Sequence, residues 1–244
     1  MSKLSEALQK KRRGESARVM GFGAQAAEKD RALLIGAGGE SGAEALEAGA
    51  DFVAVAADDA ESAIAALDGL DGLLGVQIAS LTEEDVTALE EAGADFAIVN
   101  AEAAAASIVE SELGLVLEVD EAWEDAPLRA LATLSLDAVL VRSPVTNFTV
   151  ARRISLGRIA ALCGVALIVT VTPSISSSEL AALRETGAGG IIPTEGTSSD
   201  EFSDLIEHLE AVPARNTNRR IEGGFAIVPP AGSSGEQEEF EDDD

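Results

Sequence analysis

Short apolar runs alternate with helical runs between residues 32 and 211 of this chain. The apolar runs consist mainly of Val, Ile, Leu and Ala, a composition typical of buried parallel strands. They predict strands at residues 32–36, 52–56, 73–79, 96–100, 115–119, 138–142, 166–171 and 190–193. The intervening segments predict helices, among them 60–67, 178–186 and 199–211. Several of these segments end in glycine, which readily adopts the left-handed backbone conformation that terminates a helix.

The alternation predicts a single (β/α)8 barrel, a TIM barrel, over residues 31–213. Strands joined by helices lie parallel, and right-handed crossovers leave a closed barrel or an open doubly wound sheet. The phrase GADFVAV begins at Gly49 and returns as GADFAIV at Gly93, with weaker echoes at 136–141, 164–171 and 187–193. This repetition, and a chain of 244 residues, favour the barrel. No strand is followed by GxGxxG or GxxxxGK[ST], the motifs that support the open nucleotide-binding sheets.

Two extensions of opposite charge flank the predicted barrel. Residues 1–30 form a basic N-terminal arm, and residues 214–244 form a C-terminal extension that ends in an acidic tail. The composition of that tail is typical of disorder. The arm could lie across the acidic barrel of a neighbouring copy, which would make a homo-oligomer sensitive to salt.

The charge of the chain limits its partners. The net charge is −27, and residues 32–214 carry six arginines, no lysine and 32 acidic residues. Such a surface repels nucleic acid and anionic membranes, so we expect neither as a partner. There is no apolar run of membrane-spanning length and no secretory signal, so we expect a cytoplasmic location. The single cysteine, Cys163, excludes an internal disulfide framework, and its helical context predicts a buried, inert thiol.

The GADFV phrase resembles strands of the phosphate-metabolite TIM barrels, a ribulose-phosphate-binding and aldolase-like superfamily. Its members include deoxyribose-phosphate aldolase, thiamine-phosphate synthase and indoleglycerol-phosphate synthase. The resemblance is confined to the strand joints and identifies no specific family. It implies that the Phe of the phrase and the residue two positions later, here Ala54 and Ile98, point into the barrel. In the aldolase a Schiff-base lysine follows the phrase, and because the barrel segment has no lysine, that chemistry is excluded.

The same inward phase, applied to every strand, implies a polar set at the strand ends, where active sites of such barrels lie. Polar side chains are costly to bury unpaired, so we expect these residues to meet each other or a ligand. The set comprises Gln77, Asn100, Glu118, Arg142, Thr170, Thr172 and Thr194. Glu118 and Arg142 lie on neighbouring strands and are the predicted catalytic residues. Arg142 would clamp a carboxylate or phosphate and Glu118 would act as a general base. Alternatively, they form an ion pair without chemistry.

A phosphate site and bound cofactors are weaker predictions. The superfamily holds phosphate in the loops after strands seven and eight, which implies roles here for Ser174, Ser176, Gly196, Thr197 and Ser198. Those residues fit ordinary helix N-capping equally well, and Glu195 and Asp200 are negative where phosphate would sit. We predict no metal site. Glu118 and Asp120 share a face and could ligate Mg²⁺, and FMN enzymes share the barrel, so neither Mg²⁺ nor FMN is excluded. The lone His208 lies far from the strand ends.

These features leave two hypotheses for the function. In the first, the barrel binds or converts a small metabolite, phosphorylated or carboxylated, and any enzyme activity is of lyase, isomerase or synthase type. In the second, the barrel is a non-catalytic structural or scaffold subunit of an oligomer or larger complex. The inward polar set favours the first hypothesis. The absence of lysine and histidine from the strand ends, together with the oppositely charged extensions, favours the second.

Overall fold

The computed structural model describes residues 2–13, 31–39, 42–79, 81–103 and 111–213. These residues belong to one compact unit, Met1–Pro213. The predicted C-terminal extension with its acidic tail, and residues 14–30 of the predicted arm, lie outside the described residues.

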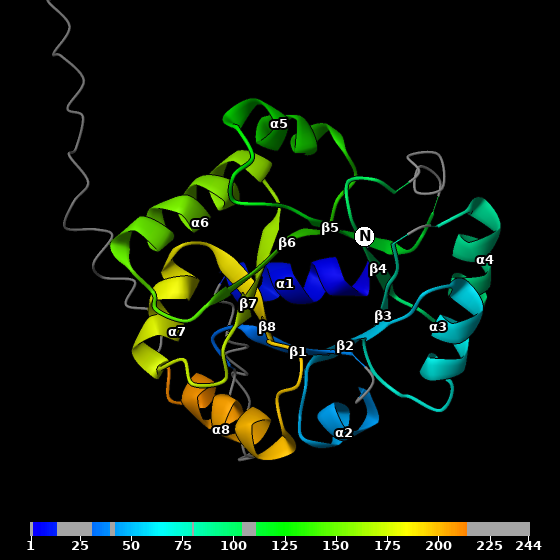
Figure 1. The fold of residues 1–244 in the computed structure, drawn as a ribbon, viewed down its shortest axis with the longest axis horizontal. Coiled ribbons are helices and arrows are strands. Elements are labelled where there is room, and N and C mark those ends of the chain that lie inside the picture. Colours follow the sequence, from blue (N-terminus) through cyan, green and yellow to red (C-terminus); the bar gives the residue numbers. More distant parts are fainter. Residues whose placement is uncertain (1, 14–30, 40–41, 80, 104–110, 214–244) are drawn as a thin grey trace, which may run out of the picture. The chain divides into compact units, whose positions relative to one another are not determined.

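Eight parallel strands form a closed barrel in chain order, which confirms the predicted (β/α)8 fold (Figure 1). The strands are β1 (Leu34–Gly38), β2 (Phe52–Ala56), β3 (Leu74–Gln77), β4 (Phe96–Val99), β5 (Gly114–Glu118), β6 (Ala138–Val145), β7 (Ala166–Val171) and β8 (Ala188–Pro193). Strand β1 begins two residues later than predicted. Strand β6 runs three residues further, because it carries a register shift against β7 between Val141 and Val145.

The helices that follow the strands lie on the outside of the barrel, and one helix precedes β1 (Figure 1). The helix that precedes β1 is α1 (Lys3–Arg13). The helices that follow strands are α2 (Gly42–Glu47), α3 (Ala60–Leu67), α4 (Glu83–Glu91), α5 (Asp125–Ala130) with the 3-10 turn η2 (Leu131–Thr133), α6 (Val150–Cys163), α7 (Ser177–Glu185) and α8 (Ser199–Glu210). Among the described helices, none combines the length and apolar character needed to cross a membrane. Cys163 is buried at the end of α6, and this burial raises the pKa of its thiol.

The repeated GAD phrase has a structural role at the N-terminal ends of the strands. Its aspartate, immediately before an even-numbered strand, accepts a hydrogen bond from a backbone N–H near the start of the preceding odd-numbered strand. These bonds join Asp51 to Ile35 at 2.8 Å, Asp95 to Leu74 at 3.0 Å and Asp137 to Leu115 at 2.9 Å. In the two full copies, the glycine of the phrase has a φ of 99° (Gly49) or 88° (Gly93). The phrase therefore turns the chain and joins neighbouring strands, at the end of the barrel opposite the expected site.

Two phenylalanines of the phrase pack inside the barrel. The rings of Phe52 and Phe96 are fully buried and meet edge to face, with centroids 5.8 Å apart. Gly36 faces the first ring and Gly75 the second, and a Cβ atom at either glycine would lie 2.2 Å from a ring carbon. The inner cluster also contains Ala54 and Ile98, which confirms the inward phase implied by the family resemblance.

Helix α1 also packs side chains into the barrel interior. The inward faces of β2 and β4 begin with phenylalanine. At the corresponding positions β6 and β8 have the small residues Ala138 and Gly190, which leave space for side chains of α1. Leu4 and Leu8 of α1 have no exposed surface and belong to the same inner cluster. A methyl carbon of Leu8 lies 3.4 Å from the position that a Cβ of Gly190 would take. Figure 1 shows α1 crossing the ring of strands.

An ion pair also ties α1 to the N-terminal end of the barrel. The ammonium nitrogen of Lys3 lies 2.7 Å from a carboxylate oxygen of Asp95, directly before β4. The described part of the predicted arm thus packs on its own barrel. Because α1 closes this end, a ligand would enter from the opposite end, at the C-termini of the strands.

Candidate functional site

Six of the seven predicted site residues stand two positions after a residue of the barrel interior. Side chains alternate along a strand, so the four of these residues that lie within strands share the inner face of the barrel with the interior residues: Gln77, Glu118, Arg142 and Thr170. The pairs, interior residue first, are Gly75 and Gln77, Ile98 and Asn100, Val116 and Glu118, Leu140 and Arg142, Ile168 and Thr170, and Ile192 and Thr194. Three of the seven directly follow the end of a strand: Asn100 follows β4, Thr172 follows β7 and Thr194 follows β8. All seven residues are half-buried.

Glu118 and Arg142 form an ion pair at the mouth of the barrel. The Nε of Arg142 donates to Oε1 of Glu118 at 2.7 Å, and its Nη2 donates to the same oxygen. The side chains remain 25% exposed for Glu118 and 38% exposed for Arg142. Oε2 of Glu118 and Nη1 of Arg142 make no hydrogen bond with the described part of the chain. The pair therefore keeps a free acceptor and free donors that a ligand can reach.

Two of the remaining five residues form side-chain hydrogen bonds with the backbone. Asn100 accepts a hydrogen bond from the backbone N–H of Glu102 at 2.9 Å, and the hydroxyl of Thr172 donates to the carbonyl of Val145 at 3.2 Å. These two side chains thus stabilise the loops in which they lie. The structure brings only Glu118 and Arg142 of the seven into direct contact within the described residues.

An ion-pair network that the sequence analysis missed holds the loop after β5 against α6. Arg152 pairs with Glu121 at 2.7 Å and Arg158 with Asp125 at 2.8 Å. Arg158 also donates to the carbonyl of Trp123 at 2.9 Å. The signal available in the sequence was the three arginines of α6, which has no acidic residue of its own. The network fixes the loop beside the Glu118–Arg142 pair.

The possible Mg²⁺ ligand Asp120 lies in this same loop. Its Oδ1 accepts the backbone N–H of Ala122 at 2.7 Å, so this carboxylate stabilises the turn. In the part of the chain that the structure describes, no group of three or more His, Cys, Asp or Glu side chains is arranged to hold a metal ion. The ring Nδ1 of His208 forms a hydrogen bond of 2.9 Å with the carbonyl oxygen of Ile175. This bond joins α8 to the loop after β7.

The predicted phosphate loops are built as helix N-caps. Ser176 caps α7 and donates to Glu179 at 2.6 Å, and Ser198 caps α8 and donates to Glu201 at 2.8 Å. Both are capping boxes, in which the glutamate returns to the N-cap backbone. Hydrogen bonds from Ser176 and from the backbone N–H of Phe148 lower the pKa of Glu179, and bonds from Ser198 lower that of Glu201. Each helix N-terminus thus already holds an anionic carboxylate where phosphate would bind.

The other predicted phosphate residues also take part in the local structure of these loops. The hydroxyl of Thr197 donates to the carbonyl of Thr194 at 2.7 Å, and Gly196 between them has a φ of 78°. Ser174 is exposed, and its hydroxyl lies 3.5 Å from that of Thr172. These contacts account for the Ser, Thr and Gly composition of the loops through turns and caps.

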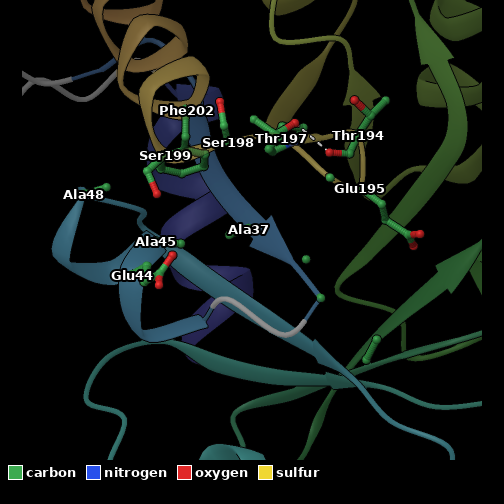
Figure 2. A pocket seen from close by; sticks show the side chains of 15 residues that line it. Ala37, Glu44, Ala45, Ala48, Thr194, Glu195, Thr197, Ser198, Ser199 and Phe202 are labelled. Carbon is green, nitrogen blue, oxygen red and sulfur yellow. Dashed lines mark hydrogen bonds between the residues drawn. The ribbon is translucent and has the colours of Figure 1, made fainter.

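A pocket of about 520 Å³ lies beside the barrel mouth, between the C-terminal ends of β1 and β8 and helices α2 and α8 (Figure 2). Its wall combines small residues such as Ala37 and Ala45 with the hydroxyl side chains of Thr194, Thr197 and Ser199. Among the described residues that line the pocket, the charged ones are Glu44 and Glu195, and none is a lysine or arginine. The residues after β8 were predicted as part of a site, whereas the α2 side was not, because its alanines have no distinctive chemistry and Glu44 is one of many acidic residues in the chain.

Replacement of Glu179 by glutamine tests the capping box of α7. The lowered pKa of Glu179 means that its stabilisation is present above the ordinary glutamate pKa and is lost as the pH falls. We expect the variant to lose about 1 kcal/mol of unfolding free energy at neutral pH, as for a lost N-cap. Its stability should also vary less between about pH 5 and pH 3. Urea unfolding across this range measures both effects. Glu47→Gln, on the exposed surface of α2, is the control, and equal pH slopes for Glu179→Gln and wild type would contradict this role.

Comparisons with known proteins support the fold. The chain matches no protein-family model. It also matches no curated protein sequence. Among solved structures, a tryptophan synthase from M. tuberculosis is similar with a TM-score of 0.63 and 15% identity, over 87% of this chain and 98% of that chain. Phosphoribosyl anthranilate isomerase from Thermus thermophilus is similar with a TM-score of 0.56 and 16% identity, over 74% and 100%. The tryptophan synthase alpha subunit from Campylobacter jejuni has a TM-score of 0.54 and 12% identity, over 72% and 95%. At these identities the likeness shows a shared TIM-barrel fold.

Proposed function

We propose that this barrel binds a small carboxylated metabolite at the C-terminal ends of its strands, with Arg142 as the anchor. The observation that carries this proposal is the open Glu118–Arg142 pair on the inner face of the mouth. A guanidinium presents its donors in a planar fork that fits a carboxylate bidentately. A carboxylate is favoured over a phosphate because the two helix N-termini that would help to bind phosphate are occupied by Glu179 and Glu201.

Glu118 is the proposed general base for a lyase, isomerase or synthase reaction. Its Oε2 has no hydrogen-bond partner in the described residues and lies beside the anchor. A carboxylate in this position can accept a proton from a carbon or oxygen next to the bound anionic group. When a ligand carboxylate takes the Nη donors of Arg142, Glu118 loses part of its own pairing and becomes available for proton transfer.

The pocket beside β8 is the proposed site for the rest of the metabolite. Thr194 belongs both to the predicted inward polar set and to the pocket wall. Glu44 and Glu195 favour hydroxyl or ammonium groups, which donate hydrogen bonds to carboxylates. Tryptophan synthase and phosphoribosyl anthranilate isomerase share the fold with this chain, and enzymes of this fold bind their ligands at this end of the barrel.

A structural role for the same pair is the second candidate. One oxygen of Glu118 already receives two hydrogen bonds from Arg142, so the two charges neutralise each other without a ligand. This observation favours a barrel that serves as a scaffold subunit, in which the pair joins β5 to β6.

Thermal shift measurements across a panel of small carboxylates and phosphates distinguish these two functions. We expect at least one carboxylate to stabilise the wild-type protein, and Arg142→Gln to weaken its binding at least about tenfold, because a charge-assisted hydrogen bond is lost. Glu118→Gln should retain binding but lose conversion of the compound. Arg129→Gln, which removes a guanidinium from exposed helix α5, is the matched control. If no compound stabilises the wild type and both site variants melt several degrees lower, the pair is structural.

A further inference from the structure

Helix α6 presents an apolar stripe that the barrel does not use. Val150 is 75% exposed and Ile154 is 68% exposed, and neither belongs to a core cluster of the barrel. Gly157 and the exposed Ala161 continue the same line. Spacings of four, three and four residues keep side chains on one face of a helix, as in the seam of a coiled coil. These four residues are called the α6 stripe below.

The packing of the chain itself does not explain why residue 157 is a glycine. Glycine in the interior of a helix is destabilising relative to alanine. A Cβ atom at Gly157 would meet nothing within 4 Å, so the described barrel does not require the small residue. The glycine does allow a side chain or a backbone from outside the chain to come close to the axis of α6.

The α6 stripe is complementary in size to its own two-fold image. Its N-terminal half carries the large residues Val150 and Ile154, and its C-terminal half carries the small residues Gly157 and Ala161. An antiparallel helix pair with its two-fold axis between positions 155 and 156 places Ile154 of each copy against Gly157 of the other. The same axis places Val150 against Ala161. A two-fold interface makes each of these contacts twice, so every large residue meets a small one.

The charge on α6 also favours a second copy as the partner. With a net charge of −27, two copies repel each other over most of their surfaces. Among the described α-helices, α6 is the only one with no acidic residue. Two of its arginines are neutralised within the chain, Arg152 by Glu121 and Arg158 by Asp125. The third arginine, Arg153, is exposed and adds one positive charge to each copy. Of the described α-helices, α6 is therefore the one that adds no negative charge to a contact between two copies.

We propose that the chain forms a two-fold symmetric homodimer through antiparallel packing of the α6 stripes. Apolar contact drives this association, while the net charge of each copy opposes it. Salt screens that repulsion, so the dimer becomes stronger as ionic strength rises. An oligomer held together by a basic N-terminal arm on an acidic neighbour has the opposite salt dependence.

Sedimentation velocity of the full chain, at about 0.01 M and about 1 M NaCl, tests the proposal, since the Debye length falls from about 30 Å to about 3 Å over this range. We expect more dimer at the higher salt. Ile154→Glu should raise the dimer dissociation constant at least about tenfold. Ala43→Glu makes the same charge change at an exposed alanine of α2 and should leave the dimer unchanged. A wild type that is monomeric at both salt concentrations overturns the proposal, as does a dimer that salt weakens.

Gly157→Leu separates the proposed packing from unspecific apolar association. The variant has room to fold, because nothing lies near the added side chain. The proposed packing predicts a weaker dimer, since the leucine takes the space of Ile154 from the other copy. The double variant Ile154→Ala/Gly157→Leu exchanges the large and small positions and should recover the dimer. A dimer that Gly157→Leu strengthens would show that the stripe associates without this register and would overturn the proposal.

Discussion

Replacement of Leu8 by alanine is expected to lower the free energy of unfolding by about 2–5 kcal/mol, the range for large-to-small substitutions in a core. Leu8 has no exposed surface and fills the interior beside Gly190. The interior there cannot collapse easily, because the surrounding strands are closed into a barrel. Urea unfolding at two protein concentrations measures the loss and shows whether it depends on association.

Lys10→Ala is the matched control for this prediction, because Lys10 is exposed on the same helix. It should change the unfolding free energy by no more than about 0.5 kcal/mol. If Leu8→Ala were as stable as the wild type, α1 would not be part of the barrel core. A loss that disappears at high protein concentration would instead place α1 on a neighbouring copy.

Gly75→Ala is expected to destabilise the barrel by about 1–3 kcal/mol or more, by overpacking the interior. The added Cβ would lie 2.2 Å from the Phe96 ring, which cannot retreat because it is fully buried and packs against Phe52. Phe96→Leu removes ring atoms from this contact. The double variant should therefore lose less stability than the sum of the two single variants, as a double-mutant cycle would measure.

Gly157→Ala is the control for the effect of adding a methyl group to a glycine. No atom of its own chain lies within 4 Å of the added carbon, and the position is helical, so we expect the monomer to gain about 0.5–1 kcal/mol of unfolding free energy at low salt, where the proposed dimer is weakest. The two Gly→Ala changes thus have opposite expected signs. Strict additivity of Gly75→Ala and Phe96→Leu would mean that the ring and the glycine do not constrain each other.

The barrel and its inward phase were predictable because the GADFV phrase combines several local signals. Its glycine turns the chain, and its alternating apolar residues define a strand. The role of its aspartate was not predictable from the phrase, because it depends on a backbone N–H of another strand. Asp95, which accepts a hydrogen bond from Leu74, is an example. That pairing exists only after the strands are placed side by side.

The role of α1 was not predictable from the same patterns. Leu4 and Leu8 are the two large apolar residues of a helix that is mostly polar and basic, and the local sequence does not indicate what they contact. Their partner is the space left by Ala138 and Gly190, which lie more than a hundred residues away. By contrast, the N-caps of α7 and α8 could have been predicted, since Glu179 and Glu201 stand three residues after a serine, as in a capping box.

The Glu118–Arg142 contact was predictable from strand adjacency, but its openness was not. Whether the two groups retain a free acceptor and free donors depends on the rotamers of both side chains and on the exposure of the mouth. The same holds for the pocket beside β8, whose walls of Ala37 and Ala45 have no distinctive chemistry.

A crystal structure with a stabilising carboxylate bound tests the proposed function most directly. We expect the carboxylate of the ligand to lie within about 2.7–3.2 Å of the guanidinium nitrogens of Arg142, at the C-terminal ends of the strands. Oε2 of Glu118 should face the neighbouring atom of the ligand. A ligand bound elsewhere, with the Glu118–Arg142 pair unchanged and the mouth of the barrel filled only by solvent, would contradict the proposal.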